Sequence, residues 1–204
     1  MQLRINWLGL AGGVTIIVVI IVSLFYPWWQ LTVGKDLVTA NVSPLKTNFD
    51  VLSTTFTIPL LWAINLVSIL TLIASSITMI VYSLFPAKSY SKQLLDFAYK
   101  KPLFMLVSFV VVLFVLTLLV QVLLKLSVPL AGSVTSTFPI PFLQGTTVGV
   151  FISTGFQWPF WLAVVAAGLC IAARLYHRRV ALIQKQNVAV EAAPPTVPSA
   201  TAAS

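Results

Sequence analysis

The stretch from residue 103 to residue 124, LFMLVSFVVVLFVLTLLVQVLL, contains no charged residue and consists almost entirely of Leu, Val and Phe. A membrane core of about 30 Å needs about 20 apolar residues in a helix, so this stretch is long enough to cross one. In the whole chain of 204 residues, 59% are hydrophobic and 8% are charged. A soluble domain carries about 25% charged residues, and a disordered chain is poor in hydrophobic ones. The composition therefore excludes both classes and indicates an integral membrane protein.

Three further segments are similarly apolar. The four spans are expected at about 8–25, 58–85, 103–124 and 158–176. Each should be a continuous helix, because lipid offers no partner to backbone polar groups. Pro59 and Pro159 lie in the first turns of their spans, where the missing N–H costs little. We therefore predict an all-α integral membrane protein, a four-transmembrane-helix bundle within residues 1–185 that carries a small extracellular β-rich cap. Residues 186–204 should form a disordered cytoplasmic tail.

The cations predict the orientation of the bundle. With four spans, both termini and the segment 86–101 share one side of the membrane. That side holds Arg4, Lys88, Lys92, Lys100, Lys101, Arg174, Arg178, Arg179 and Lys185, and the other holds Lys35, Lys46 and Lys125. Such a bias predicts a multi-pass protein of the cell membrane with both termini cytoplasmic. Topology and attraction to the membrane surface explain the net charge of +8, so no nucleic acid is expected as a partner.

The two external segments, roughly 27–57 and 127–157, are rich in Thr, Val, Phe and Gly. Their β-branched runs are bounded by turn residues, which is typical of strands. Strands are predicted at 31–33, 37–42, 49–57 and 146–154. The segment from Phe138 to Phe142 contains two prolines and is expected to be an extended loop. A small sheet, or two hairpins, should pack on the helix ends, because isolated hairpins are marginally stable in water.

The external segments carry few charged residues, and two explanations stay open. Either the exterior is acidic, where carboxylates lose their charge, or a partner covers this surface. Asn41 begins the only sequon and is a candidate glycosylation site, although Pro44 follows the motif. Cys170 is the single cysteine, so no internal disulfide can form.

Polar residues recur at steps of three and four along the second span, which places them on one helix face. They are Asn65, Ser68, Thr71, Ser75, Thr78 and Tyr82. In lipid such a face must meet protein or water. Two readings follow: hydrogen bonding between helices, which we favour, or a polar lining for a substrate or ion path.

Small residues also recur at helical spacing. Gly9 and Gly13 form a G-x-x-x-G in the first span, and Ala163, Ala167 and Gly168 repeat small residues in the fourth. Such faces let helix backbones approach closely. Helices one, two and four should therefore make the tight contacts, and the third should face lipid.

Tryptophans gather near the predicted ends of the spans. Trp28, Trp29, Trp158 and Trp161 are interpreted as anchors at the membrane–water interface.

Several kinds of chemistry have no residues to support them. His177 is the only histidine, so the chain has neither a zinc or copper cluster nor a pair of axial haem ligands. No P-loop, G-x-S-x-G motif or paired carboxylates occur. No Asp, Glu, Lys or Arg lies at the expected mid-membrane depth, where a proton relay would need one. The sequence therefore predicts no enzyme, no cofactor and no metal.

Four spans, internal termini, a β-rich first external segment and the pair Trp28-Trp29 after the first span together resemble the claudin-type tetraspan layout. The chain lacks that family's paired external cysteines and its Gly-Leu-Trp motif. The resemblance is one of layout, and no family residue or junctional role is carried over.

Three functional hypotheses follow. The leading one is a non-catalytic membrane protein that acts through protein contacts, as an accessory subunit or envelope scaffold of a membrane complex. Its partners would be the lipid bilayer and other membrane proteins or further copies of itself. The alternatives are a small oligomeric channel or facilitator lined by the polar face of the second span, and a cofactor-free subunit of a respiratory or oxidase complex.

Overall fold

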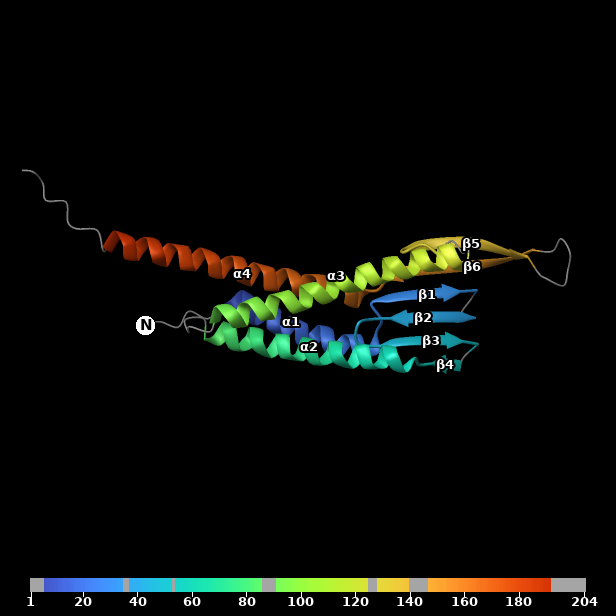
Figure 1. Cartoon of the computed structure of the whole chain (residues 1–204), viewed down its shortest axis with the longest axis horizontal. Coiled ribbons are helices and arrows are strands. Elements are labelled where there is room, and N and C mark those ends of the chain that lie inside the picture. Colours follow the sequence, from blue (N-terminus) through green and yellow to red (C-terminus); the bar gives the residue numbers. More distant parts are fainter. Residues whose placement is uncertain are drawn as a thin grey trace, which may run out of the picture.

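The computed structural model describes residues 6–34, 37–52, 54–85, 91–124, 128–139 and 147–191. The helices of this part are α1 (Trp7–Phe25), α2 (Pro59–Leu84), α3 (Ser91–Leu124) and α4 (Trp158–Glu191). The strands are β1 (Trp29–Val33), β2 (Val38–Val42), β3 (Thr47–Val51), β4 (Thr54–Phe56), β5 (Gly132–Pro139) and β6 (Thr147–Phe156). The strands lie at one end of an elongated molecule, beyond the helices (Figure 1).

The all-α prediction is wrong, because the segments between the helices form one six-stranded antiparallel sheet. Its strand order is β4-β3-β2-β1-β6-β5. Strands β1 and β6 pair at its centre, from Trp29 opposite Phe156 to Val33 opposite Ile152. This pairing joins the two segments that were predicted to be external, which are far apart in the sequence. The chain is therefore a mixed α/β protein, in which a six-stranded sheet accompanies the four helices.

The strand boundaries also differ from the predicted ones. The run at 49–57 forms two strands, because the chain turns at Leu52, whose φ is +49°. Strand β5 includes Phe138 and Pro139, which we expected in a loop. A proline is tolerated there because β5 is an edge strand, where a backbone N–H on the outer side has no neighbouring strand to bond. The remainder of the expected loop, residues 140–142, lies outside the described residues.

Each of the four helices is long and apolar enough to cross a membrane. Two of them exceed the predicted spans. Helix α3 already begins at Ser91 and contains Pro102, and α4 continues to Glu191, into the expected tail. The rest of that tail, 192–204, lies outside the described residues. At 1.5 Å per residue, a helix of 34 residues is about 50 Å long and exceeds the membrane core.

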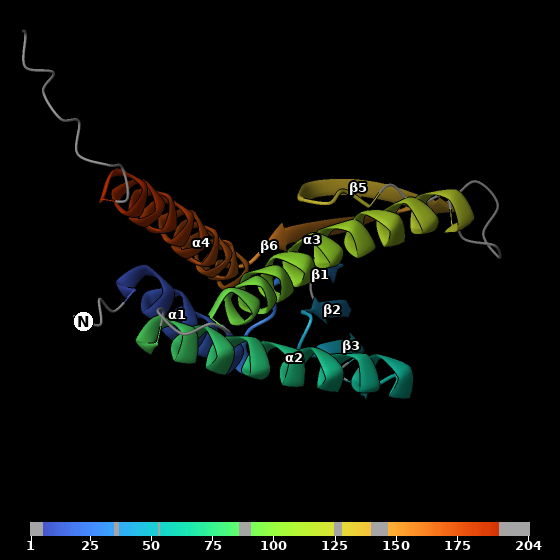
Figure 2. The same cartoon turned by 60° about the vertical axis from the view of Figure 1, so that its left-hand side comes forward.

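Helix α1 packs between α2 and α4, and α3 contacts both α2 and α4. Figures 1 and 2 show that α2 and α3 lie close together at the end far from the sheet and diverge toward it. In the most apolar 18-residue stretch of α3, 11% of the residues are buried, whereas the corresponding share is 39% in both α1 and α4. The large exposed apolar surface of α3 is therefore available to lipid or to another protein.

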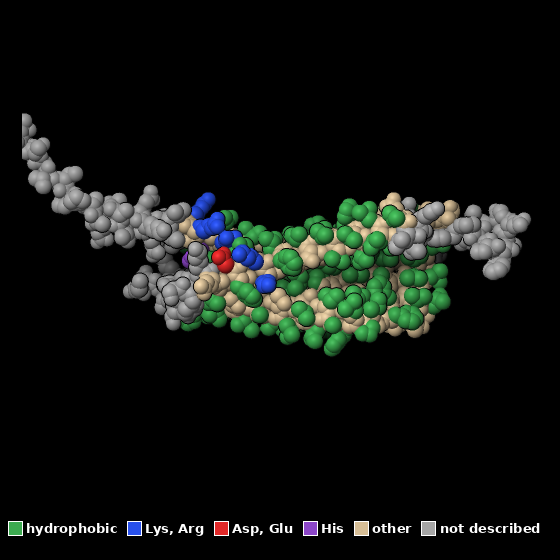
Figure 3. Space-filling view, viewed as in Figure 1, with side chains coloured by type: hydrophobic (Ala, Val, Ile, Leu, Met, Phe, Trp, Pro, Cys, Tyr) green, Lys and Arg blue, Asp and Glu red, His purple; other side chains and the backbone are tan. Residues whose placement is uncertain are grey.

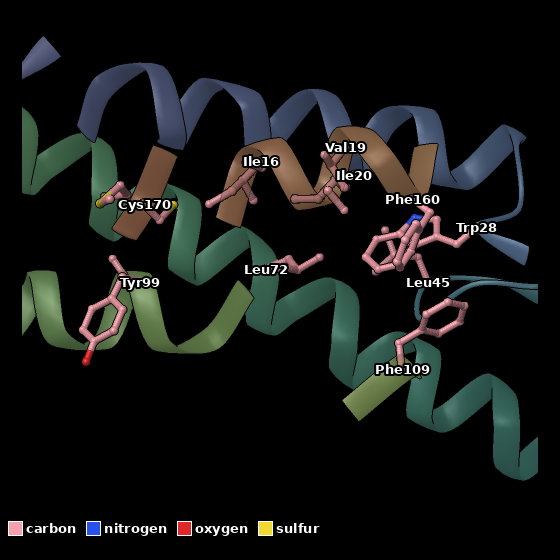
Figure 4. Close-up of a cluster of buried hydrophobic side chains, with 14 of the residues drawn as sticks. Ile16, Val19, Ile20, Trp28, Leu45, Leu72, Tyr99, Phe109, Phe160 and Cys170 are labelled. Carbon is pink, nitrogen blue, oxygen red and sulfur yellow. The ribbon is translucent and has the colours of Figure 1, made fainter. Parts of the chain in front are cut away.

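A continuous cluster of buried side chains holds these elements together (Figure 4). At the end far from the sheet it contains Tyr99 and Cys170, and Ile16 and Leu72 occupy its middle. At the sheet end, Trp28 packs edge-on against Phe109 of α3 and Phe160 of α4, with ring centroids 5.2 and 6.2 Å away. The core thus extends from the helices into their junction with the sheet.

Candidate functional site

The polar side chains of α2 meet different partners, although they share one face of the helix. The hydroxyls of Thr71 and Thr78 donate to the carbonyls of Val67 and Ala74 in their own helix. Ser68 is half-buried. The other three contact other elements: Ser75 binds α3, Tyr82 binds the residue before α1, and Asn65 binds the turn between β2 and β3. In the single chain, these residues do not line a common path.

Ser75 compensates for a proline in the neighbouring helix. Pro102 has no N–H, so the carbonyl of Ala98, four residues earlier in α3, loses its normal helical partner. The hydroxyl of Ser75 donates to this carbonyl at 2.7 Å, and Ser75 is fully buried. A polar residue of the predicted stripe therefore has a definite structural role, which the spacing of residues within α2 alone could not reveal.

This pairing makes Ser75→Ala a test of the helix contact. In the natural background the substitution leaves the carbonyl of Ala98 buried without a partner, so it should cost about 1–3 kcal/mol of stability. Pro102→Ala restores an N–H to that carbonyl, so adding Ser75→Ala to it should cost clearly less. Thermal unfolding of the wild type, the two single variants and the double variant in mild detergent measures the difference. Equal costs in both backgrounds would contradict the assignment.

Asn6 joins three helices at the end far from the sheet. Its side-chain oxygen accepts from the N–H of Gly9 at 3.2 Å and so caps α1. Its Nδ2 donates to the hydroxyl of Tyr82 at 3.2 Å and to the carbonyl of Ala173 at 3.4 Å. Asn6 was not among the residues predicted from the sequence to have a role. Its position directly before an apolar run is the usual signal of an N-cap.

The small residues divide into a packed group and an exposed one. A Cβ added at Gly9 would lie 2.4 Å from Ser83 Oγ, and one at Gly13 would lie 2.7 Å from Ile80 Cγ1, so both glycines face α2. Ala163 and Ala167 of α4 are buried. Gly168 is exposed, and a Cβ there would meet nothing within 4 Å. The close approach of α1 to α2 therefore requires glycine at these two positions, whereas no neighbouring helix requires glycine at residue 168.

The tryptophans expected at the interface also fall into two groups. Trp28 and Trp29 are buried, and their indole N–H groups donate to Ser23 Oγ at 2.7 Å and to the carbonyl of Leu130 at 2.8 Å. Trp158 and Trp161, at the start of α4, are exposed. The structure therefore places the first pair inside the junction between bundle and sheet, and the second on its surface.

Asn65 of α2 fixes the turn between β2 and β3 to the bundle. In the amide orientation that satisfies both groups, its nitrogen donates to the carbonyl of Pro44 at 3.2 Å. Its oxygen accepts from the N–H of Thr47 at 3.0 Å. A cavity of about 320 Å³ lies beside this contact, lined by the end of α1, the turn and the first half of α2. Asn41, the candidate glycosylation site, is half-buried within β2 and lines a smaller adjoining cavity of about 110 Å³.

Charged side chains gather at the end far from the sheet (Figure 3). Among the cations whose side chains the structure describes, those of α3 and α4 lie at this end, and they are Lys100, Lys101, Arg174, Arg178 and Arg179. Arg174 lies 3.6 Å from the carboxylate of Asp96, and its guanidinium covers the ring of Tyr99 at 4.0 Å from the centroid. It also donates to the hydroxyl of Tyr99. Arg174 thus links α4 to the start of α3.

The residues that the structure describes contain no group of three or more His, Cys, Asp or Glu side chains able to hold a metal ion. Within the same part of the chain, every buried side-chain nitrogen or oxygen has a hydrogen-bond partner. No protein-family model matches this chain, and no curated protein has a matching sequence.

Proposed function

We propose that the chain is a multi-pass protein of the cell membrane with both termini in the cytoplasm and the sheet outside. The distribution of charge supports this orientation. Among the cations whose side chains the structure describes, five lie at the end far from the sheet and one, Lys46, lies at the sheet end. Positive residues remain preferentially on the cytoplasmic side during membrane insertion. The added length of α3 and α4 is also at the cation-rich end, where it can enter the cytoplasm.

Its proposed role is that of a non-catalytic accessory subunit or envelope scaffold, which contacts other membrane proteins or second copies through the external sheet. The observation that carries this proposal is that both external segments form one sheet whose outer strands, β4 and β5, each have a single partner strand. An edge strand presents free backbone N–H and C=O groups, with which another chain can pair.

The sheet is well suited to such contacts because it is fixed to the bundle. The N–H of Gln157, before α4, donates to the carbonyl of Trp28 at 2.8 Å, and Asn65 holds the turn between β2 and β3. A fixed surface loses less conformational entropy on binding than a flexible loop does. The separate partners of the polar residues on α2 give no comparable support to a channel.

Variants with one added cysteine test the orientation and the contact together. Thr135 of β5 is exposed, and the natural Cys170 is fully buried and should stay unlabelled. A membrane-impermeant maleimide carrying a benzophenone should label Thr135→Cys in intact cells but not Lys101→Cys. Irradiation should then produce a discrete cross-linked product, and native mass measurement in mild detergent should show the same assembly.

Two outcomes separate the parts of this proposal. Labelling of Lys101→Cys in intact cells would contradict the orientation. A monomer in detergent, together with no cross-linked product from Thr135→Cys or from Thr54→Cys in β4, would contradict the scaffold role and leave the orientation standing.

A further inference from the structure

Two adjoining cavities lie where α1, α2 and the turn between β2 and β3 meet. Their volumes are about 320 and 110 Å³, and both are lined by Leu24, Lys46 and Asn48. The larger one also contacts Trp62, Asn65 and Leu66 of α2. Together they provide a cation and amide groups beside apolar helix surface. We propose that this site binds an anionic membrane lipid, with its phosphate at Lys46 and its acyl chains along α1 and α2.

The polar part of the site has groups free to bind an anion. Within the described residues, the side chains of Lys46 and Asn48 have no hydrogen-bond or ion-pair partner. The nearest described carboxylate along the strand, that of Asp50, accepts from the hydroxyls of Thr39 and Thr55. Lysine and amide N–H groups are donors that match phosphate oxygens.

The backbone that carries Lys46 is held in place from both sides. Ser43 is buried, and its hydroxyl accepts from the N–H of Lys46 at 2.9 Å and donates to the carbonyl of Lys46 at the same distance. Asn65 binds the adjacent Pro44 and Thr47. The cation is therefore presented by a fixed turn, which lowers the entropic cost of binding.

The site also lies at the depth expected for lipid headgroups. Exposed aromatic side chains surround this level of the bundle: Tyr26 after α1, Trp62 in α2 and Trp158 in α4 are 54%, 61% and 52% exposed. Tyr and Trp are enriched at the membrane–water interface. Leu24 and Leu66 are 40% and 42% exposed and continue from the cavity onto the apolar helix surface. A headgroup can enter the cavity while its acyl chains remain in the hydrocarbon.

The experiment measures lipid binding to the full chain in nanodiscs of phosphatidylcholine that contain increasing phosphatidylglycerol. Native mass spectrometry counts the lipids retained. Because the chain has six tryptophans, the quenching of Trp62 by phosphatidylglycerol with brominated chains is measured as the difference between each protein and the same protein with Trp62→Phe, and it reports the location. Wild-type protein should retain phosphatidylglycerol in preference to phosphatidylcholine. One lysine near a membrane surface contributes about 1 kcal/mol, so Lys46→Gln should weaken retention about fivefold. Lys46→Arg should keep it, because the charge is kept.

Lys100→Gln is the matched control, because Lys100 is also exposed but lies at the opposite end of the bundle. It should leave the quenching of Trp62 unchanged. Equal losses for Lys46→Gln and Lys100→Gln, or no preference for phosphatidylglycerol in the wild type, would overturn the proposal. Full competition by millimolar inorganic phosphate would show a site for free anions instead of lipid. The proposal rests on membrane placement but not on the scaffold role, so each can fail separately.

Discussion

We expect the substitution Gly13→Leu to disrupt the contact between α1 and α2 and to cost about 3 kcal/mol, the upper end of the usual cost of overpacking. The first added carbon would already lie 2.7 Å from Ile80 Cγ1 and 3.4 Å from the backbone oxygen of Ser76. The two helices cannot easily separate there, because the hydroxyl of Ser76 donates to the carbonyl of Gly13 at 3.0 Å. Thermal unfolding in mild detergent measures the loss.

Gly168→Leu is the control for this prediction. It makes the same change within an apolar helix, at a glycine whose added Cβ meets nothing within 4 Å. Its unfolding temperature should match that of the wild type or exceed it slightly, because leucine favours helix more than glycine does. If both variants unfolded at the same reduced temperature, close packing at Gly13 would not be the cause.

The four long apolar helices could be predicted from the sequence, because runs of about 20 apolar residues, the length that a membrane core requires, are easy to recognise. The helix ends were less predictable. The charged and polar residues from Ser91 to Lys101 extend α3 through Pro102, although a proline usually ends or bends a helix. This continuation depends on Ser75 in another helix, which binds the freed carbonyl of Ala98.

Most of the strands were predicted, but the class of the fold was missed because β5 and the joining of both segments into one six-stranded sheet were not. Strand β5 consists largely of Ser, Thr and Gly and ends at a proline, so neither alternation nor propensity marks it clearly. It becomes a strand because β6 pairs with it along its whole length, from Gly132 to Pro139. The pairing of β1 with β6, which merges the two segments into one sheet, is a long-range contact that local pattern cannot show.

The candidate site was predictable only in part. Lys46 was predicted to be an external cation, and Asn65 to lie on the polar face of the second span. Their proximity depends on the turn between β2 and β3 reaching back to the bundle, where Asn65 binds Pro44 and Thr47. Similarly, Trp28 resembles an interfacial anchor in the sequence because it follows an apolar span. The structure buries it because α3 and α4 place aromatic rings beside it.

Trp28→Ala should have the largest effect of any substitution at the junction of bundle and sheet, a loss of about 3–5 kcal/mol, since it leaves a cavity in a packed core. The ring is 2% exposed and contacts Phe109 and Phe160. The sheet should separate from the bundle before the helices unfold, because the ring fills the space between them. Limited proteolysis of the segment between α1 and α2, followed alongside thermal unfolding in detergent, measures both events.

Two further variants separate the ring from its hydrogen bond. Trp28→Phe keeps most of the apolar contact but removes the N–H that donates to Ser23 Oγ at 2.7 Å, so it should cost about 1–3 kcal/mol. Trp161→Ala removes a ring that is 59% exposed and contacts Phe160, and it should cost much less than Trp28→Ala. If instead the two alanine variants lost equal stability, Trp28 would contribute only as a surface residue would. The junction would then have to be held by its backbone hydrogen bonds, such as that from the N–H of Trp28 to the carbonyl of Val42 at 3.1 Å.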